Sequence, residues 1–376
     1  MVKKISPATI ITVLIVLVLS IIVLYYNNTL RVPSIFDGKF YTNTLIKPSV
    51  KPKHLSEKLI NLPDVSLWLD STLAAKYLYP DFFLQNSSTT SFLIVKNDTV
   101  IYKRYLNGVK EGECTQLFSV TKVFITALLG IAIQDKIIPN VNVPVSNYFN
   151  HLQSKQFNTL TLRHLTQMES GLDYDEYGKI FKTLQYYYEN NLTRAIYSAK
   201  FDTPPGMQYK YKSIDTQILG ECIKKALKHK KILDYLQDKI WNPIGIQDTA
   251  YWALDSRISR NLKYYGGLNM SARDLAKFGL LILHHGKINK KQIFAPNWYN
   301  YCNDTLHRST GEDKYCMGWY YYSNQNVATD NVYYAAGFNG QIMMINETKK
   351  VIIIRLGKDR GGVNWYPILK KLTELV

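Results

Sequence analysis

Cysteine is scarce in this sequence, with four residues in a chain of 376. Four cysteines are too few to build a disulfide scaffold, and none forms a Cys-x-x-Cys pair that would hold zinc or exchange disulfides. Whether Cys302 and Cys316 pair is left open by the sequence. The chain also lacks a Gly-x-Ser-x-Gly turn, a His-Glu-x-x-His helix and a phosphate-binding loop. With 46% hydrophobic and 20% charged residues, it is neither disordered nor collagenous nor a coiled coil as a whole.

Acidic residues are also few: 29 Asp and Glu against 46 Lys and Arg give a net charge of +17. Residues 1–60 hold eight basic and two acidic groups, which is +6 of that total. A second basic run, 224–231, is typical of the solvated face of a helix, with contact to an anionic membrane or wall polymer as the alternative. Because no nucleic-acid-binding motif accompanies the charge, nucleic acid is not an expected partner.

Residues 8–26 form a nearly pure apolar run without a charge. As a helix this run would be about 28 Å long, enough to cross a bilayer core. No small-residue cleavage site follows it, so an uncleaved signal anchor is favoured over a cleaved signal peptide. Lys3 and Lys4 would keep the N-terminus in the cytoplasm, with the rest of the chain on the outer, periplasmic or extracellular side.

Strand-like segments stand at both ends of the remaining chain, and helix-like segments lie between them. Residues 91–95 and 99–105 predict one hairpin, and 332–338, 341–345 and 351–356 predict further strands, with Asn339-Gly340 as a tight turn. The pattern predicts an α+β fold (an α/β sandwich), whose antiparallel sheet combines N- and C-terminal segments and is flanked by helices, with an inserted helical domain. The predicted division is 1–26 cytoplasmic stub and transmembrane anchor, 27–85 stalk and N-terminal extension, 86–140 with 258–376 α/β domain, and 141–257 helical domain.

The most informative segment is 117–133, which is apolar nearly all round and therefore predicts a helix buried on every side. Lys122 is its one ionisable residue, and burial of a lone ammonium is costly and lowers its pKa. Ser119 lies three residues earlier, on the same helical face and at the helix N-terminus, where an anion is favoured. A serine nucleophile needs a neighbouring base and oxyanion donors, so the pair predicts nucleophilic catalysis. The alternative is that Ser119 caps a core helix while Lys122 extends outward to solvent.

The surrounding segments resemble the serine β-lactamase and penicillin-binding-protein superfamily. Ser119-Val-Thr-Lys122 resembles its first motif, and the closer similarity is to its β-lactamase-related hydrolases, which include class C enzymes, esterases and 6-aminohexanoate-dimer hydrolase. The resemblance runs from about residue 91 to residue 356. Its further markers are residues 162–174, 205–213, 266–268, 272–279 and 335–341.

The resemblance implies a role for each matching residue. Ser119 would be acylated, Lys122 would activate it, and Tyr211 would pass a proton to the leaving group and later activate water. Ser213 would hydrogen-bond near Lys122. The backbone N–H groups of Ser119 and Phe338 would form the oxyanion hole.

Three further positions follow from the resemblance. Ala335-Ala336-Gly337 corresponds to the third motif, and Tyr174 matches a substrate-side tyrosine of the dimer-hydrolase branch. Ala335 stands where penicillin-binding enzymes place a cation that holds the substrate carboxylate. Its presence favours esters or amides without that carboxylate over β-lactams and peptides.

The sequence therefore predicts a membrane-anchored serine hydrolase that cleaves a small-molecule or peptide-like ester or amide through an acyl-enzyme, with no metal and no organic cofactor. One alternative is a β-lactamase or DD-peptidase of the same superfamily. The other is a catalytically silent envelope-binding module that kept the fold.

Overall fold

The structure, a computed structural model, describes residues 6–29, 33–37, 41–149, 155–174, 176, 186–288, 290–296, 298, 313–322 and 331–376. The strands are β1 Asn43–Ile46, β2 Ser56–Glu57, β3 Thr89–Lys96, β4 Thr99–Tyr105, β5 Thr115–Gln116, β6 Ala250–Ala253, β7 Leu268–Met270, β8 Lys287–Ile288, β9 Lys291–Gln292, β10 Asp313–Cys316, β11 Trp319–Tyr322, β12 Val332–Gly337, β13 Gln341–Asn346 and β14 Val351–Gly357. The α-helices are α1 Pro7–Thr29, α2 Ser71–Lys76, α3 Pro80–Asn86, α4 Lys122–Gln134, α5 Lys155–Thr159, α6 Leu162–Thr166, α8 Leu192–Tyr197, α9 Ser213–Ala226, α10 Ile232–Leu236, α11 Asn242–Ile244, α12 Ala272–Leu283 and α13 Trp365–Leu375.

The main sheet joins the two ends of the chain. Among the described residues its order is β10-β11-β12-β13-β14-β3-β4-β2, antiparallel except for the parallel pair β2–β4. Strand β3 pairs with β4 on one side and with the C-terminal β14 on the other. The predicted mixed α/β fold with a sheet from both termini is therefore confirmed. A second described sheet, β1-β6-β7-β5, joins two strands from the N-terminal third of the chain to β6 and β7.

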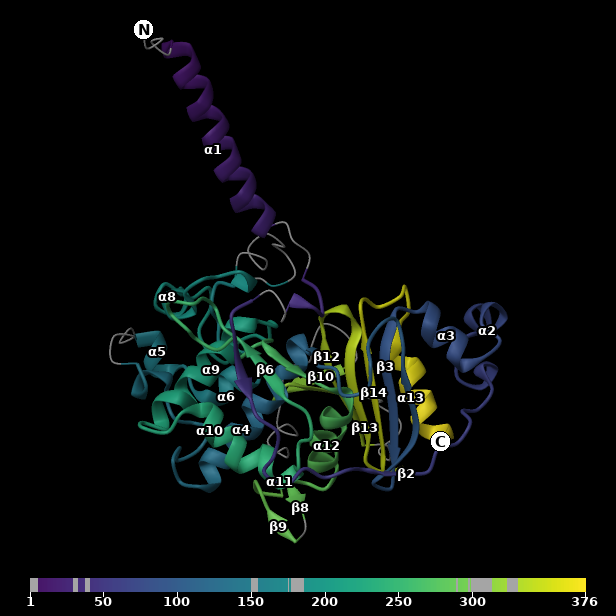
Figure 1. Ribbon diagram of the computed structural model, residues 1–376. Helices are drawn as coiled ribbons and strands as arrows, with labels where there is room; N and C mark the ends of the chain where they lie inside the picture. Colours follow the sequence, from purple (N-terminus) through teal and green to yellow (C-terminus); the bar gives the residue numbers. More distant parts are fainter. Residues whose placement is uncertain are drawn as a thin grey trace.

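Alternating side chains bury both faces of the main sheet. On β3, Leu93 and Val95 pack into the core that also contains α4 and α12, whereas Phe92 and Ile94 pack on the opposite face with α13. Figure 1 shows α12 and α13 beside the sheet formed by β3, β13 and β14. The result is a three-layer sandwich, with a helical region from α5 to α11 beside it. The region predicted as the helical domain also contains β6, and the domain division itself stays a prediction.

The two predicted hairpins have the backbone that their turn residues favour. Asn97 and Asp98 have φ angles of 46° and 63° between the paired β3 and β4. Positive φ at both central positions of this two-residue turn matches the twist of antiparallel strands. Asn339 and Gly340, at 62° and 75°, are the last two of the three residues between β12 and β13. Asn, Asp and Gly tolerate positive φ best. The second turn is also held by a side chain of β14, because the buried Arg355 donates to the carbonyl oxygens of Asn339 and Gly340, at 3.2 and 2.8 Å.

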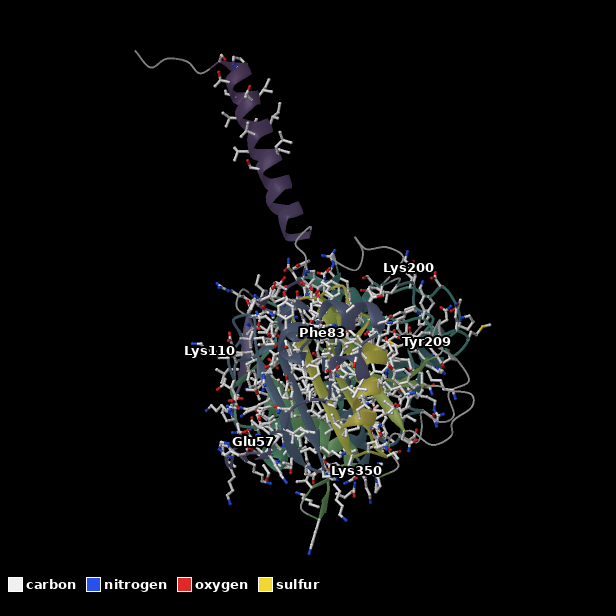
Figure 2. The ribbon with its side chains drawn as sticks, turned by 90° about the vertical axis from the view of Figure 1, so that its right-hand side faces the viewer. Glu57, Phe83, Lys110, Lys200, Tyr209 and Lys350 are labelled. Atoms are coloured by element: carbon white, nitrogen blue, oxygen red, sulfur yellow. The ribbon has the colours of Figure 1, made fainter. Side chains whose placement is uncertain are left out.

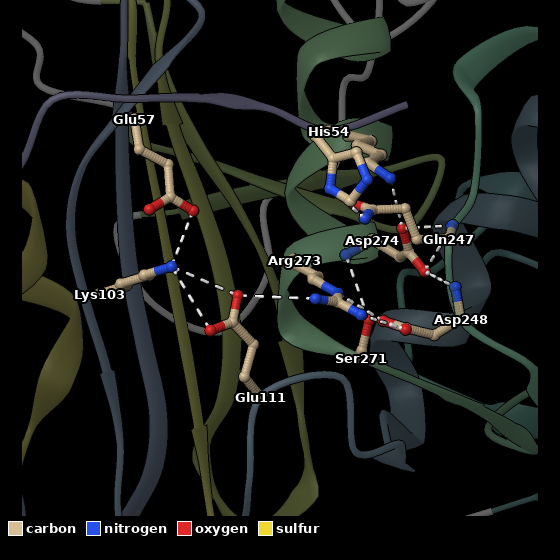
Figure 3. A network of polar contacts seen from close by, with 10 residues as sticks. His54, Glu57, Lys103, Glu111, Gln247, Asp248, Ser271, Arg273 and Asp274 are labelled. Atoms are coloured by element: carbon tan, nitrogen blue, oxygen red, sulfur yellow. Dashed lines mark hydrogen bonds and ion pairs between the residues drawn. The ribbon is translucent and has the colours of Figure 1, made fainter. Parts of the chain in front are cut away.

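Much of the segment predicted as stalk and N-terminal extension packs on the rest of the protein. Strand β1 pairs with β6, and the side chains of Ile46, Trp68 and Phe83 are buried. A polar network adds to this attachment (Figure 3): Glu57 contacts Lys103 at 2.7 Å, and Glu111 lies between Lys103 and Arg273. Partly exposed ion pairs of this kind contribute little stability each, so burial of the apolar side chains accounts for the attachment.

Helix α1 covers the apolar run at the N-terminus. It projects away from the other elements (Figures 1 and 2), and its side chains from Ile10 to Leu19 are about half-exposed. Within the described residues, however, no helix combines the length and apolarity needed to cross a membrane. The predicted transmembrane helix is therefore not supported.

Three exposed lysines lie far apart from one another. Lys110, Lys200 and Lys350 lie at separate edges in Figure 2, whereas Phe83 is inside. Cys316 is disulfide-bonded, and Cys302, the partner considered from the sequence, lies outside the described residues. Cys114 and Cys222 are free thiols.

Candidate active site

Ser119 lies in a short 3-10 helix, Phe118–Thr121, immediately before α4. The chain reaches it from β5 through Phe118, whose φ of 47° is unusual for an aromatic residue. The ring of Phe118 packs edge-on against that of Phe338, with 5.6 Å between their centroids. Strained backbone of this kind is held only where the surroundings determine it, and here it places Ser119 at the mouth of a buried helix.

Lys122 is almost completely buried, with 1% of its surface exposed, so the alternative of a lysine that extends outward is excluded. Its Nζ lies 2.9 Å from Ser119 Oγ, 3.2 Å from Ser213 Oγ and 2.9 Å from the carbonyl oxygen of Tyr265. Burial lowers its pKa to about 8, although the nearby Glu176 and Asp215 oppose that fall. A substantial neutral fraction therefore exists at mildly alkaline pH, and a neutral amine can accept the proton of a hydroxyl.

Ser213, the first residue of α9, and Tyr211, which lies two residues before it, also approach Lys122. The Nζ of Lys122 lies 5.0 Å from the ring centroid of Tyr211. Tyr211 is 8% exposed and packs edge-on against Tyr315 at 5.5 Å. The structure thus brings Ser119, Lys122, Tyr211 and Ser213 together from two distant segments.

The end of β12 lies against the turn that carries Ser119. A Cβ on Gly337 would be 2.4 Å from the carbonyl oxygen of Leu117 and 3.3 Å from Ser119 N, so no side chain fits there. Phe338 follows directly, and its carbonyl oxygen accepts a 3.2 Å hydrogen bond from Gln341. The close approach of Gly337 and the ring contact between Phe338 and Phe118 bring Phe338 to the turn that carries Ser119, and the N–H role of Phe338 stays a prediction. Ala335 is fully buried and packs in the main core.

Tyr174 is connected to the four central side chains through the rings of two other tyrosines. Its ring packs edge-on against Tyr186 at 5.0 Å, and Tyr186 lies 5.2 Å from the ring of Tyr265. Tyr265 supplies the carbonyl that accepts from Lys122. Tyr174 therefore belongs to an aromatic wall beside the site, and its predicted contact with substrate stays untested.

Sequence reasoning did not identify two acids near Lys122. Glu176 accepts hydrogen bonds from Ser213 N at 2.5 Å and from Ser213 Oγ at 2.7 Å. Asp215, in the first turn of α9, is fully buried, and burial raises its pKa to about 7. Neither lies in a local pattern that marks catalysis, because their proximity to Lys122 arises only from tertiary contact. Across the described part of the chain, no group of three or more His, Cys, Asp or Glu is arranged to hold a metal ion.

Comparison with known proteins gives consistent matches. The model of the Beta-lactamase family matches residues 84–364. Protein flp of Staphylococcus aureus (strain MW2) is 27% identical over 173 residues, which is 43% of this chain but only 34% of that protein, so the match spans about a third of its length.

Two solved structures share the fold over most of the chain. A Bacillus anthracis protein described as a 6-aminohexanoate-dimer hydrolase has a TM-score of 0.77 and 21% identity, and 91% of each chain is covered. A penicillin-binding protein from Bacillus halodurans has a TM-score of 0.63 and 14% identity, with 78% of this chain and 98% of that chain covered. At these identities the similarity shows the fold alone.

Proposed function

Because the chain belongs to the beta-lactamase family, we propose that it is a serine hydrolase that cleaves an ester or amide through an acyl-enzyme. The observation that carries the proposal is the 2.9 Å contact between Ser119 Oγ and the Nζ of the buried Lys122. A catalytically silent module would have no need to maintain a buried lysine at hydrogen-bond distance from a serine, because burial of that group costs stability.

In the proposed acylation step, the proton of Ser119 moves to neutral Lys122 as Oγ bonds to the substrate carbonyl carbon. The oxyanion is stabilised by the N–H groups of Ser119 and Phe338. Tyr211 then gives a proton to the leaving oxygen or nitrogen as that bond breaks. In the second half, the Tyr211 phenolate takes a proton from the water whose oxygen attacks the acyl carbon. The bond between that carbon and Ser119 Oγ then breaks, and the Lys122 ammonium returns its proton to Ser119.

The expected substrate class follows from the small side chain at position 335, where a cation would be needed to bind a carboxylate. A small, buried, uncharged residue at that position cannot pair with a substrate carboxylate. We therefore favour small-molecule or peptide-like esters and amides over β-lactams.

A parallel assay tests the proposal. A fluorophosphonate probe should label the protein, and p-nitrophenyl esters should be hydrolysed faster than nitrocefin. Faster turnover of nitrocefin, or a stable penicillin adduct on Ser119, would support a β-lactamase or DD-peptidase instead. Absence of both labelling and turnover would contradict the hydrolase itself.

The acylation rate should rise with pH through about 8. Below that value Lys122 is mostly an ammonium and cannot accept the proton of Ser119, since its pKa lies near 8. At pH 6 about 1% would be neutral, so acylation should be about a hundredfold slower than on the plateau above pH 9. Stopped-flow measurement of the nitrophenolate burst checks this, and a flat profile between pH 6 and 9 would remove Lys122 as the base.

Gly337→Ala should lower kcat/KM by about a hundredfold, because the new Cβ must displace either Leu117 or the end of β12 from the nucleophile. Steady-state kinetics with a p-nitrophenyl ester gives the loss. The matched control is Ala336→Ser on the neighbouring, partly exposed position. Equal losses in both variants would show general damage to the strand and not a specific effect beside Ser119.

Localisation remains a separate prediction. From the sequence we propose that the N-terminus is cytoplasmic and that the catalytic domain lies on the outer side of a membrane. Release of the full chain by carbonate washing alone, without detergent, would contradict an integral anchor.

A further inference from the structure

Glu176 contacts the candidate site at Ser213, from which it accepts two hydrogen bonds. The residue is half-buried, and its carboxyl group accepts from both the N–H and the hydroxyl of Ser213. Ser213 is the first residue of α9, whose preceding residue, Lys212, makes no capping hydrogen bond with its side chain. Glu176 therefore supplies from another segment the acceptor that this helix end requires.

The two contacts fix the direction of the hydrogen bonds around Lys122. Burial raises the pKa of Glu176, while Lys122 and the two contacts with Ser213 oppose that rise. In its ionised form the carboxylate only accepts, so the hydroxyl proton of Ser213 is then committed to Glu176. The oxygen of Ser213 can then only accept from Lys122, as the carbonyl oxygen of Tyr265 also must. A neutral amine has two N–H donors and one lone pair. With both donors taken, the lone pair is left for Ser119.

We propose that Glu176 is a positioning residue that, through Ser213, turns the lone pair of Lys122 toward Ser119 and holds the segment carrying Tyr211. The inference rests on the proposed serine hydrolase function and adds to it an acid that acts through Ser213. With a glutamine at position 176, we expect the hydroxyl of Ser213 to point the other way, toward Lys122. The glutamine carbonyl would face the N–H of Ser213, its NH₂ would donate to the hydroxyl oxygen, and the Ser213 proton would then turn toward the lone pair of Lys122.

Charge and orientation make separable contributions here. The groups that face Lys122 are the carboxyls of Glu176 and Asp215 and the rings of Tyr211 and Tyr265. Both carboxyls oppose the fall in the pKa of Lys122, so removing either charge should move the acylation midpoint to lower pH. Only Glu176 binds Ser213, so only its loss should also disturb the direction of the lone pair.

The experiment compares Glu176→Gln with the charge-matched control Asp215→Asn, using the pH dependence of the acylation rate in the full chain. We expect both variants to shift the midpoint to lower pH. We expect the plateau rate to fall by about ten- to a hundredfold in Glu176→Gln and by less than about twofold in Asp215→Asn. A plateau in Glu176→Gln equal to that of the unchanged chain would overturn the positioning role, as would equal plateau losses in both variants.

A second comparison shows whether Glu176 acts through Ser213 and decides the matter if Glu176→Gln does not fold. Ser213→Ala should lower the plateau about as much as Glu176→Gln, and the double variant should be no more than about twofold slower than either. Additive losses, or an unchanged plateau in Ser213→Ala, would overturn the inference. If the unchanged chain is not labelled at Ser119 by a fluorophosphonate, the proposed function itself fails, which is a different result from any of these.

Discussion

Replacing Ser119 with alanine will abolish fluorophosphonate labelling and lower ester hydrolysis by about ten-thousandfold or more. The reason is that removal of a nucleophile leaves only binding and oxyanion stabilisation to accelerate the reaction. Intact-protein mass spectrometry of the labelled chain measures the first effect, and p-nitrophenyl ester turnover measures the second.

This substitution should change the stability of the fold only slightly. Ser119 is half-buried, and Lys122 keeps its contacts with Ser213 and Tyr265 when the hydroxyl is lost. We expect the free energy of unfolding to change by no more than about 1 kcal/mol. Undiminished labelling of the alanine variant would show that another residue is the nucleophile, and peptide mapping of the adduct would identify it.

Lys122→Met should lower the acylation rate by about a thousandfold at pH 8.5, because a thioether of similar length cannot accept the proton of Ser119. Methionine fills the buried site with little change in volume, so packing should be largely kept. Burst kinetics with a chromogenic ester reports the rate. A variant that acylates within about tenfold of the unchanged chain would exclude Lys122 as the base.

The same substitution has a pH-dependent effect on stability whose sign can be worked out. The pKa of Lys122 falls from 10.5 in the unfolded chain to about 8 in the folded one, which costs the folded state about 3 kcal/mol below pH 8. Between pH 8 and 10.5 the unfolded chain binds the extra proton, so the unchanged protein gains stability as pH rises through this window. The methionine variant lacks this rise in stability with pH. It also loses the hydrogen bond that Lys122 donates to the carbonyl oxygen of Tyr265.

Urea unfolding at several pH values separates these terms. At pH 7 we expect the two proteins to agree within about 1 kcal/mol, since relief of the buried charge offsets the lost hydrogen bonds. Toward pH 10 the unchanged protein should become the more stable of the two. A difference in unfolding free energy that does not vary with pH would contradict the lowered pKa of Lys122.

Local patterns predicted the parts of this protein that local physics determines. Ser119 and Lys122 are one helical turn apart in the sequence, so their proximity needs no knowledge of the rest of the chain. The turns at Asn97-Asp98 and Asn339-Gly340 form because those residues accept positive φ. A sheet built from both ends of the chain followed from the strand signals there, whereas the specific pairing of β3 with β14 was not predicted.

The contacts that complete the site could not be predicted in this way. The carbonyl of Tyr265 and the carboxyl of Glu176 reach Lys122 and Ser213 from segments with no catalytic signature. The packing of the segment before α3 was missed for a related reason: its polar, proline-containing composition is typical of a linker, while a few buried side chains such as Ile46 and Trp68 secure it. Composition averages over a segment, whereas attachment depends on single residues.

Because the partners of Lys122 come from four stretches of chain, an unfolded or newly made molecule has a lysine of ordinary basicity and a serine no more reactive than any other. The fraction of the protein that a fluorophosphonate labels should therefore equal the fraction that is folded. During refolding from urea, samples quenched with the probe should gain label only as quickly as the last of these stretches packs into place. The rate of labelling would therefore report the rate at which the site around Ser119 assembles.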